Sequence, residues 1–418
     1  MIQNFEINSG EIDKIKKISK EEKNFRIKNL EVFNSKGFPN KRNEDWKFSD
    51  LKEIINKDFK SLNVKNVKSK VKKINLINDF EHNYIFLVNG HLTSSDLKFE
   101  EKDKIKITSL DKSGDIKKES SDNSLVCLNH ALSNEGYFLQ VKKNYKFKKV
   151  LVVYNLFTKD LKNNILNSKN KIKIGENSEL HIVDFTVNES KNKFINNVYE
   201  DVYLEKNSVF KNISIQNNKS LGYFHKFSKN KIQTKANYST FIFSSGLKFN
   251  KLDMQFDLEG ENSNCDLQSA LFLDKENHQE IKTKMNHLVA NCKSHQIVKK
   301  VLEADAKGVY QGKIYVKDQA QKTDAYQLSK ALLLSDNSEF NSKPELEIYA
   351  DDVKCSHGSS SGNVDQDAIH YLMTRGLSKK DSVKLLINGF LNEITEMIKS
   401  NSIRNFVVNK LEGQIHGS

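Results

Sequence analysis

A four-residue turn ending in Asn-Ser recurs along the middle of the chain, and it constrains the fold more than any other feature. Each copy follows a short apolar or alternating segment, which is typical of a half-buried strand. The copies are Gly175–Ser178, Glu205–Ser208, Gly260–Ser263 and Ser335–Ser338. Their spacing is irregular, so they do not form a strict repeat. Many short strands without intervening helices predict a β-helix, solenoid or sandwich rather than a parallel α/β sheet, and a solenoid fits best.

The regions on either side of these strands have different sequence patterns. Residues 1–146 are predicted to be a helical and mixed region, in which Trp46, the only tryptophan, is a core anchor. Within it, Tyr84–Gly90 predicts a strand that ends in an Asn-Gly hairpin turn. We therefore expect three parts: this region, a β-helix over 147–362, and a helical domain over 363–418.

The C-terminal part is predicted to contain two short helices. Acidic residues open a helix over 365–375, and Gly376 stands at its C-cap position. A second helix begins near Ser378 and carries a row of apolar residues on one face. Two short helices bury little area by themselves, so we expect them to pack on the end of the solenoid or on another protein.

Composition and charge exclude several classes of protein. The formal net charge is +13, but the lysines are spread along the chain, and no basic stripe with stacking aromatics indicates nucleic-acid binding. No apolar run approaches the roughly 20 residues that span a bilayer. The first residues lack the pattern of a secretory signal, so a cytoplasmic protein is expected. The four cysteines are far apart and form no CxxC, which predicts no disulfide framework.

The segment Pro344–Gly358 contains the candidate site. Its first half alternates as a strand does, and the alternation slips by one residue at Asp351–Asp352. Such a slip predicts a bulge or a tight corner. After it, Cys355 and His357 share one face of an extended segment, which Gly358 and Gly362 are predicted to break.

A thiolate beside an imidazole suits iron, zinc, copper or an iron–sulfur cluster. A closed metal site needs about four ligands, however, and Cys355 and His357 supply two. Taken alone the pair is more often structural, because a free cysteine usually behaves as a small buried hydrophobe.

The other motifs are weaker indications of a functional site. Gly308–Ile314 resembles a phosphate-binding loop, but it is one residue short and has Ile314 where Ser or Thr would bind Mg²⁺, so no nucleotide is expected on this chain. His278, His287 and His295 are nine and eight residues apart, which is not the spacing of metal ligands. They are expected to be ordinary strand residues.

Five segments near the C-terminal end occur in an order that resembles one known family. They are Gln319–Ala325, Leu332–Ser335, Pro344–Ile348, Ala350–Gly358 and Tyr371–Gly376. Together they are similar to the SufB/SufD family, the scaffold proteins of the Suf iron–sulfur cluster assembly machinery. Arg42–Trp46 is similar to a segment near the start of these proteins. The Cys-Ser-His-Gly form, the modest length and the few cysteines favour the SufD branch.

The resemblance implies both a fold and partners. It implies a right-handed parallel β-helix flanked by an N-terminal helical region and a C-terminal helical domain. It also implies a complex with SufB and the ATPase SufC, in which SufC docks on the C-terminal helices. Cys355 and His357 would lie where the β-helix meets SufB and would hold iron or a nascent iron–sulfur cluster, with SufB supplying the missing ligands. The chain departs from the family at His370, which replaces Phe, and at Ser359–Ser361.

Three kinds of function remain open at this point. The first is a non-enzymatic scaffold whose Cys355 and His357 hold transient iron or cluster. The second is an interaction protein that organises SufB and SufC without binding a ligand. The third is a Cys-dependent enzyme, for which the sequence indicates neither a substrate nor a catalytic partner for the thiol.

Overall fold

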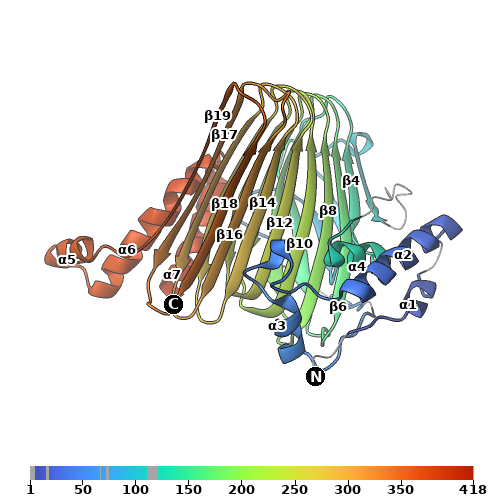
Figure 1. Ribbon diagram of the computed structural model, residues 1–418, viewed down its shortest axis with the longest axis horizontal. Helices are drawn as coiled ribbons and strands as arrows, with labels where there is room; N and C mark the ends of the chain where they lie inside the picture. Colours follow the sequence, from blue (N-terminus) through green and yellow to red (C-terminus); the bar gives the residue numbers. More distant parts are fainter. Residues whose placement is uncertain (1–4, 16–17, 66, 72–74, 111–120, 418) are drawn as a thin grey trace.

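The computed structural model describes residues 5–15, 18–65, 67–71, 75–110 and 121–417, and two long sheets form its centre (Figure 1). From β4 (Tyr137–Val141) onward, successive strands alternate between the sheets, so each coil of the chain adds one parallel strand to each sheet. The prediction of a mainly β solenoid is therefore confirmed. The ten-stranded sheet contains β1 (Asn83–Val88), β2 (His91–Asp96), β5 (Leu151–Phe157), β7 (Glu179–Asn188), β9 (Val209–Gln216), β11 (Asn237–Ser245), β13 (Asn264–Leu273), β15 (Lys293–Leu302), β17 (Thr323–Leu333) and β19 (Val353–Asn363). The nine-stranded sheet contains β3 (Ile105–Ser109), β4 (Tyr137–Val141), β6 (Ile165–Ile174), β8 (Phe194–Leu204), β10 (Ser220–Ile232), β12 (Leu247–Leu258), β14 (His278–His287), β16 (Lys307–Val316) and β18 (Glu339–Ile348).

The recurring asparagine turns form one corner of the solenoid. Asn177, Asn207 and Asn262 have φ angles of 56°, 56° and 59°, a left-handed conformation that asparagine tolerates better than most residues. The side chain of Asn207 donates to that of Asn177 over 2.9 Å, so neighbouring coils are tied together. The fourth copy, Ser335–Ser338, lies at the opposite corner, between β17 and β18. Its different place helps to explain the irregular spacing.

The N-terminal helices cover the outer face of the nine-stranded sheet. Trp46 is buried and stacks on Phe249 of β12, with 6.4 Å between ring centroids, so its prediction as a core anchor is confirmed. The predicted hairpin is also present, with Asn89 and Gly90 between β1 and β2. The helices are α1 (Gly10–Asp13), α2 (Lys20–Lys36), η1 (Glu44–Trp46), α3 (Leu51–Asp58), η2 (Lys102–Lys104) and α4 (Ser124–Leu132).

The C-terminal helices differ from the prediction in number and in packing. The predicted pair corresponds to α5 (Gln366–Thr374) and α6 (Lys379–Asn392), which are followed by η4 (Glu393–Met397) and by an unpredicted third helix, α7 (Asn401–Gly417). The later part of α6, η4 and α7 pack on the outer face of the ten-stranded sheet rather than on its end. Only α5 and the start of α6 project away from the sheets (Figure 1). No helix in the described part of the chain is long and apolar enough to cross a membrane.

We predict that α7 contributes strongly to stability. Leu411 is fully buried in the apolar cluster that α7 shares with the ten-stranded sheet. Leu411→Ala is expected to lower the free energy of unfolding by about 2–5 kcal/mol, because it removes apolar contacts and leaves a cavity. Urea unfolding would measure this loss. Leu385→Ala, at a position that is 50% exposed on α6, is the control and should change stability by less than about 0.5 kcal/mol.

Candidate functional site at the end of the solenoid

Cys355 and His357 lie on β19, the last strand of the ten-stranded sheet. In the parallel pairing with β17, Cys355 stands opposite Ala325 and His357 opposite Gln327. The other edge of β19 pairs with no strand that the structure describes. The two side chains therefore share one face of a strand whose outer edge offers free backbone donors and acceptors.

The predicted slip at Asp351–Asp352 is a corner. These residues lie between β18 and β19, where the chain crosses from one sheet to the other, and the backbone N–H of Asp352 donates to the side chain of Gln321 over 2.9 Å. The predicted break at Gly358 and Gly362 is wrong, because β19 continues to Asn363. An extended backbone accepts glycine, and pairing with β17 holds these residues in the sheet.

The two side chains differ in their surroundings. Cys355 is half-buried against the apolar core between the sheets, whereas His357 is exposed. Burial raises the pKa of the Cys355 thiol, and the backbone hydrogen bond with Ala325 acts in the opposite direction. The thiol is therefore protonated at neutral pH, and a metal ion or a cationic partner group is required to displace its proton.

Cys355 and His357 do not form a complete metal site on this chain. Across the described residues, no group of three or more His, Cys, Asp or Glu side chains is placed to hold a metal ion. Two ligands on an open strand edge leave about two coordination positions for groups from elsewhere. The arrangement thus suits a site that is shared with a second molecule.

The remaining cysteines and histidines lie in other parts of the fold. Cys127, Cys265 and Cys292 are free and buried. The three strand histidines are located as expected: His278 and His287 are on β14, and His295 is on β15. His370 is on the exposed surface of α5.

The segment that resembles a phosphate-binding loop has no loop. Gly308–Ile314 lies within β16, whose extended backbone pairs with β14 and β18. Successive N–H groups of a strand point in opposite directions and donate to neighbouring strands. They therefore cannot surround a phosphate as a phosphate-binding loop does.

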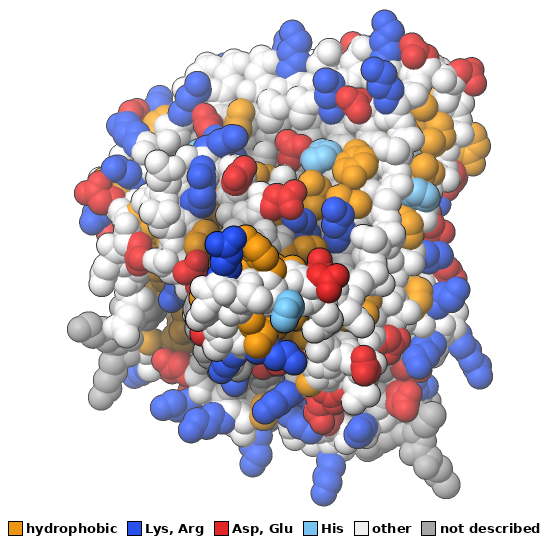
Figure 2. Space-filling model, turned by 90° about the vertical axis from the view of Figure 1, so that its left-hand side faces the viewer, with side chains coloured by type: hydrophobic (Ala, Val, Ile, Leu, Met, Phe, Trp, Pro, Cys, Tyr) orange, Lys and Arg blue, Asp and Glu red, His pale blue; other side chains and the backbone are white. Residues whose placement is uncertain are grey.

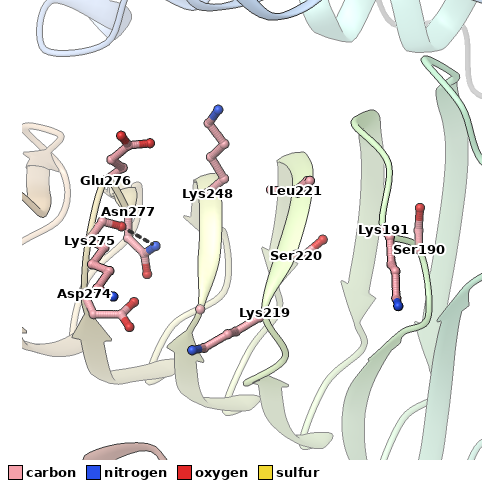
Figure 3. A pocket seen from close by; sticks show the side chains of 11 residues that line it. Ser190, Lys191, Lys219, Ser220, Leu221, Lys248, Asp274, Lys275, Glu276 and Asn277 are labelled. Carbon is pink, nitrogen blue, oxygen red and sulfur yellow. Dashed lines mark hydrogen bonds between the residues drawn. The ribbon is translucent and has the colours of Figure 1, made fainter. Parts of the chain in front are cut away.

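A groove of about 400 Å³ runs along one corner of the solenoid, several coils away from Cys355 (Figure 3). It is lined by residues at four successive corners, including Lys191, Lys219 and Lys275 and, at the start of β12, Lys248. In Figure 3, Lys248 points to one side of the groove and Lys191 to the other. Lys248 forms an ion pair with Asp58 of α3 at 3.2 Å, and no cysteine or histidine is among the lining residues. The groove is thus not a candidate metal site.

Exposed apolar residues on the projecting helices were not predicted from the sequence. Large hydrophobic side chains are exposed there at Tyr371, Met373, Leu377 and Leu385, with exposed fractions of 56%, 43%, 38% and 50%. Figure 2 views this end of the molecule and shows hydrophobic side chains among charged ones. The apolar residues were visible in the sequence, but their exposure follows from α5 and the start of α6 projecting beyond the sheets. Exposed apolar side chains on a projecting element are typical of interaction surfaces.

The terminal strand of the β-solenoid thus presents a thiol–imidazole pair, and a helical projection with exposed apolar residues follows it in the chain. The chain matches the family model of the SufBD core domain of SUF-system iron–sulfur cluster assembly over residues 157–390. It matches the model of the SufBD N-terminal region over residues 3–153. The chain therefore belongs to the SufB/SufD family.

Two relatives that match most of the chain carry names of iron–sulfur cluster assembly. It is 23% identical to the iron–sulfur cluster assembly protein SufD of Escherichia coli, over 91% of this chain and 90% of that protein. It is 24% identical to an iron–sulfur cluster assembly SufBD family protein of Synechocystis, over 90% of this chain and 87% of that protein. A chloroplastic protein of Arabidopsis thaliana, ABCI7, is 26% identical over 60% of this chain and 53% of its own length.

Proposed function

We propose that this chain is a SufD-like scaffold subunit that acts with SufB and the ATPase SufC in iron–sulfur cluster assembly. Cys355 and His357 hold iron or a nascent cluster as cargo, and SufB supplies the remaining ligands. The proposal depends on one observation above all. A thiol and an imidazole lie two residues apart on one face of the terminal strand, and the described residues around them supply no further ligand group.

The half-buried thiol suits transient binding. Because burial favours the protonated form of Cys355, the free chain does not present a thiolate to solvent. A ferrous ion held partly by the partner's ligands would lower the pKa of the thiol and bind there together with the His357 imidazole. Docking of the partner and loading of the metal are then coupled, and the cargo is released when the subunits separate.

The test is to co-express the chain with SufB and SufC and to measure iron and acid-labile sulfide in the purified complex. Cys355→Ser combined with His357→Ala is expected to lower both by about tenfold or more, because the loss of two ligands leaves an incomplete coordination sphere. The control is Lys354→Ser combined with Ser356→Ala, which changes the outward face of the same strand. Normal loading of the first variant would remove the ligand role.

A second function, that of an organising subunit without ligands, is supported by the apolar surface of α5 and α6. In the proposed complex SufC docks on this surface. Deleting everything after Gly362 would also remove α7 and expose the outer face of the sheet, so point substitutions are the sharper test.

We predict that Tyr371→Ser combined with Leu385→Ser abolishes co-purification of SufC while the chain remains folded, because both residues are exposed. Circular dichroism checks the fold, and a pull-down measures SufC. Loss of SufC together with normal cluster loading in the Cys355 and His357 variant would favour the organising role alone. Retention of SufC would contradict docking on this surface.

A further inference from the structure

Lys300 is a buried cation inside the solenoid. It lies on β15 between Val298 and Leu302, and both of these belong to the core between the two sheets. Strand alternation therefore directs Lys300 to the interior as well. The residue is 0% exposed, and its Nζ has no hydrogen-bond partner among the described residues. Lysine is almost never fully buried without a partner, because an isolated buried charge costs several kcal/mol.

Aromatic rings and a glycine accommodate this side chain. The ammonium lies 5.6 Å from the ring centroid of Tyr310 on β16 and 5.3 Å from that of Phe340 on β18. Ring faces attract cations, so this position favours the charged amine. Gly308 provides space for the stem, since a Cβ there would approach Lys300 Cδ within 3.1 Å. The lysine thus reaches across the interior from one sheet to the other.

Other polar groups without partners surround the same position. Gln279, Gly308 and Phe340 occupy one register position on β14, β16 and β18. The side chain of Gln279 is 1% exposed, and neither its nitrogen nor its oxygen makes a hydrogen bond within the described structure. Ser342, opposite Tyr310, likewise has an unbonded hydroxyl. The ammonium, the amide N–H₂ and the hydroxyl can each donate to an anion, although the hydroxyl and the amide oxygen are also acceptors.

Small residues lie between Lys300 and the open end of the solenoid. In the register of the ten-stranded sheet, Lys300 is followed by Ala331 on β17 and Ser361 on β19. The adjacent inward position is occupied by Ser329 and Ser359. Ser359 and Ser361 are exposed on the terminal strand. At this register position, the side chains that β17 and β19 place between the lysine and the end of the sheet are therefore all small.

We propose that the solenoid binds a small monovalent anion, of the size of chloride or hydrosulfide, at Lys300, and that the anion enters from the terminal coil past Ala331 and Ser361. The anion supplies the acceptor that the ammonium, the Gln279 amide and the Ser342 hydroxyl lack. This site includes neither Cys355 nor His357, so it stands or fails separately from the proposed metal ligands.

The charge of Lys300 is sensitive to this occupant. Burial lowers the pKa of Lys300 to about 7, and the charge of Glu280 acts in the opposite direction. A bound anion stabilises the ammonium and thereby raises this pKa. Without an anion, a large share of the molecules would carry a neutral amine at neutral pH.

Bromide, a heavier analogue of chloride, is the probe that locates the anion. Crystals of the full chain grown in sodium bromide are expected to show an anomalous peak next to Lys300 Nζ. In solution, sodium chloride should raise the melting temperature by about 2 °C relative to sodium gluconate at equal ionic strength, when chloride is about tenfold above its dissociation constant.

Lys300→Met removes the charge and keeps most of the length of the side chain. It is expected to abolish both the bromide peak and the chloride dependence, and to be at least as stable as the wild type because no unpaired charge remains buried. Lys293→Met, at an exposed position on the same strand, is the control and should retain both. The combined Cys355→Ser and His357→Ala variant should retain both as well.

A wild-type crystal without the bromide peak, or an equal chloride dependence in Lys300→Met, would overturn the proposal. Anaerobic addition of sodium hydrosulfide distinguishes the two sources of the anion. Loss of the bromide peak would assign hydrosulfide to the site, and persistence of the peak would restrict the site to halides.

Discussion

Glu280→Gln is expected to lower the free energy of unfolding by about 3–5 kcal/mol, because it breaks a fully buried ion pair and leaves its cation unpaired. Glu280 on β14 and Lys251 on β12 are both 0% exposed and form a direct ion pair. The carboxylate also accepts hydrogen bonds from Ser49 Oγ at 2.5 Å and from Gln311 Nε2 at 2.6 Å. The pair is thus the centre of a buried polar network between the N-terminal region and the solenoid.

This network holds the N-terminal region on the outer face of the nine-stranded sheet. Lys251 Nζ donates to the backbone oxygen of Asp45 over 2.7 Å and lies 4.5 Å from the ring centroid of Trp46. Burial alone would raise the pKa of Glu280, but the charge of Lys251, with hydrogen bonds from Lys251 and Ser49, brings it below its usual value. The carboxylate is therefore ionised at neutral pH, and its replacement by an amide removes a full charge.

Trp46 provides the measurement, because it is the only tryptophan and lies next to the ion pair. Urea unfolding is followed by its fluorescence and by circular dichroism. Glu261→Gln, an exposed acid in a connecting turn, is the control and should cost less than about 0.5 kcal/mol. Lys251→Met added to Glu280→Gln should recover much of the loss, since no charge then remains buried. A single Glu280→Gln variant as stable as the control would contradict this account.

The solenoid was predictable because the features that define it are properties of single residues and of short segments. The left-handed conformation at Asn177, Asn207 and Asn262 is a preference of the residue itself, and strand alternation is visible within each segment. The same local reasoning placed Cys355 and His357 on one face. It failed at Gly358 and Gly362, because pairing with β17 outweighs the weak strand preference of glycine.

Features that depend on contacts between distant segments were not predictable from the sequence. Cys355 is on an open edge only because its coil is the last one, and Lys300 is fully buried only because β15 has neighbouring coils on both sides. The helix α7 is a different case. Ile403, Phe406, Val407 and Leu411 recur at helical spacing, so its sequence contained a usable signal. Its packing on the sheet, by contrast, depends on tertiary contacts with segments that are distant in the sequence.

The free energy of unfolding is also expected to fall steeply as the pH drops from 7 to 5. His130, His225 and His287 are at most 4% exposed, and burial lowers their pKa values to about 2, 3 and 4. In the unfolded chain an imidazole has a pKa of about 6.5. Between these values the unfolded state binds more protons than the folded state, so acid favours unfolding. Each histidine contributes a loss of about 2 kcal/mol at pH 5.

Three carboxyl groups act against this trend. Burial raises the pKa values of Asp184, Asp253 and Asp266, so the folded state takes up protons there and gains stability as the pH falls. At pH 5 each histidine takes up close to a full proton on unfolding, because its pKa lies below this pH in the folded state and above it in the unfolded chain.

His225→Gln tests the sign and the size of the effect. Urea unfolding of this variant and of the wild type at pH 8, where the imidazole is neutral in both states, gives the cost of repacking next to Asn197. Between pH 8 and pH 5 the variant should then lose about 2 kcal/mol less stability than the wild type, since one group that takes up a proton on unfolding is gone. An equal loss in both proteins would mean that His225 is already protonated in the folded state. A buried imidazolium at that position would need an anionic partner, but His225 Nδ1 contacts the neutral amide of Asn197. We therefore expect a neutral His225 in the folded state and a smaller loss of stability in the variant than in the wild type.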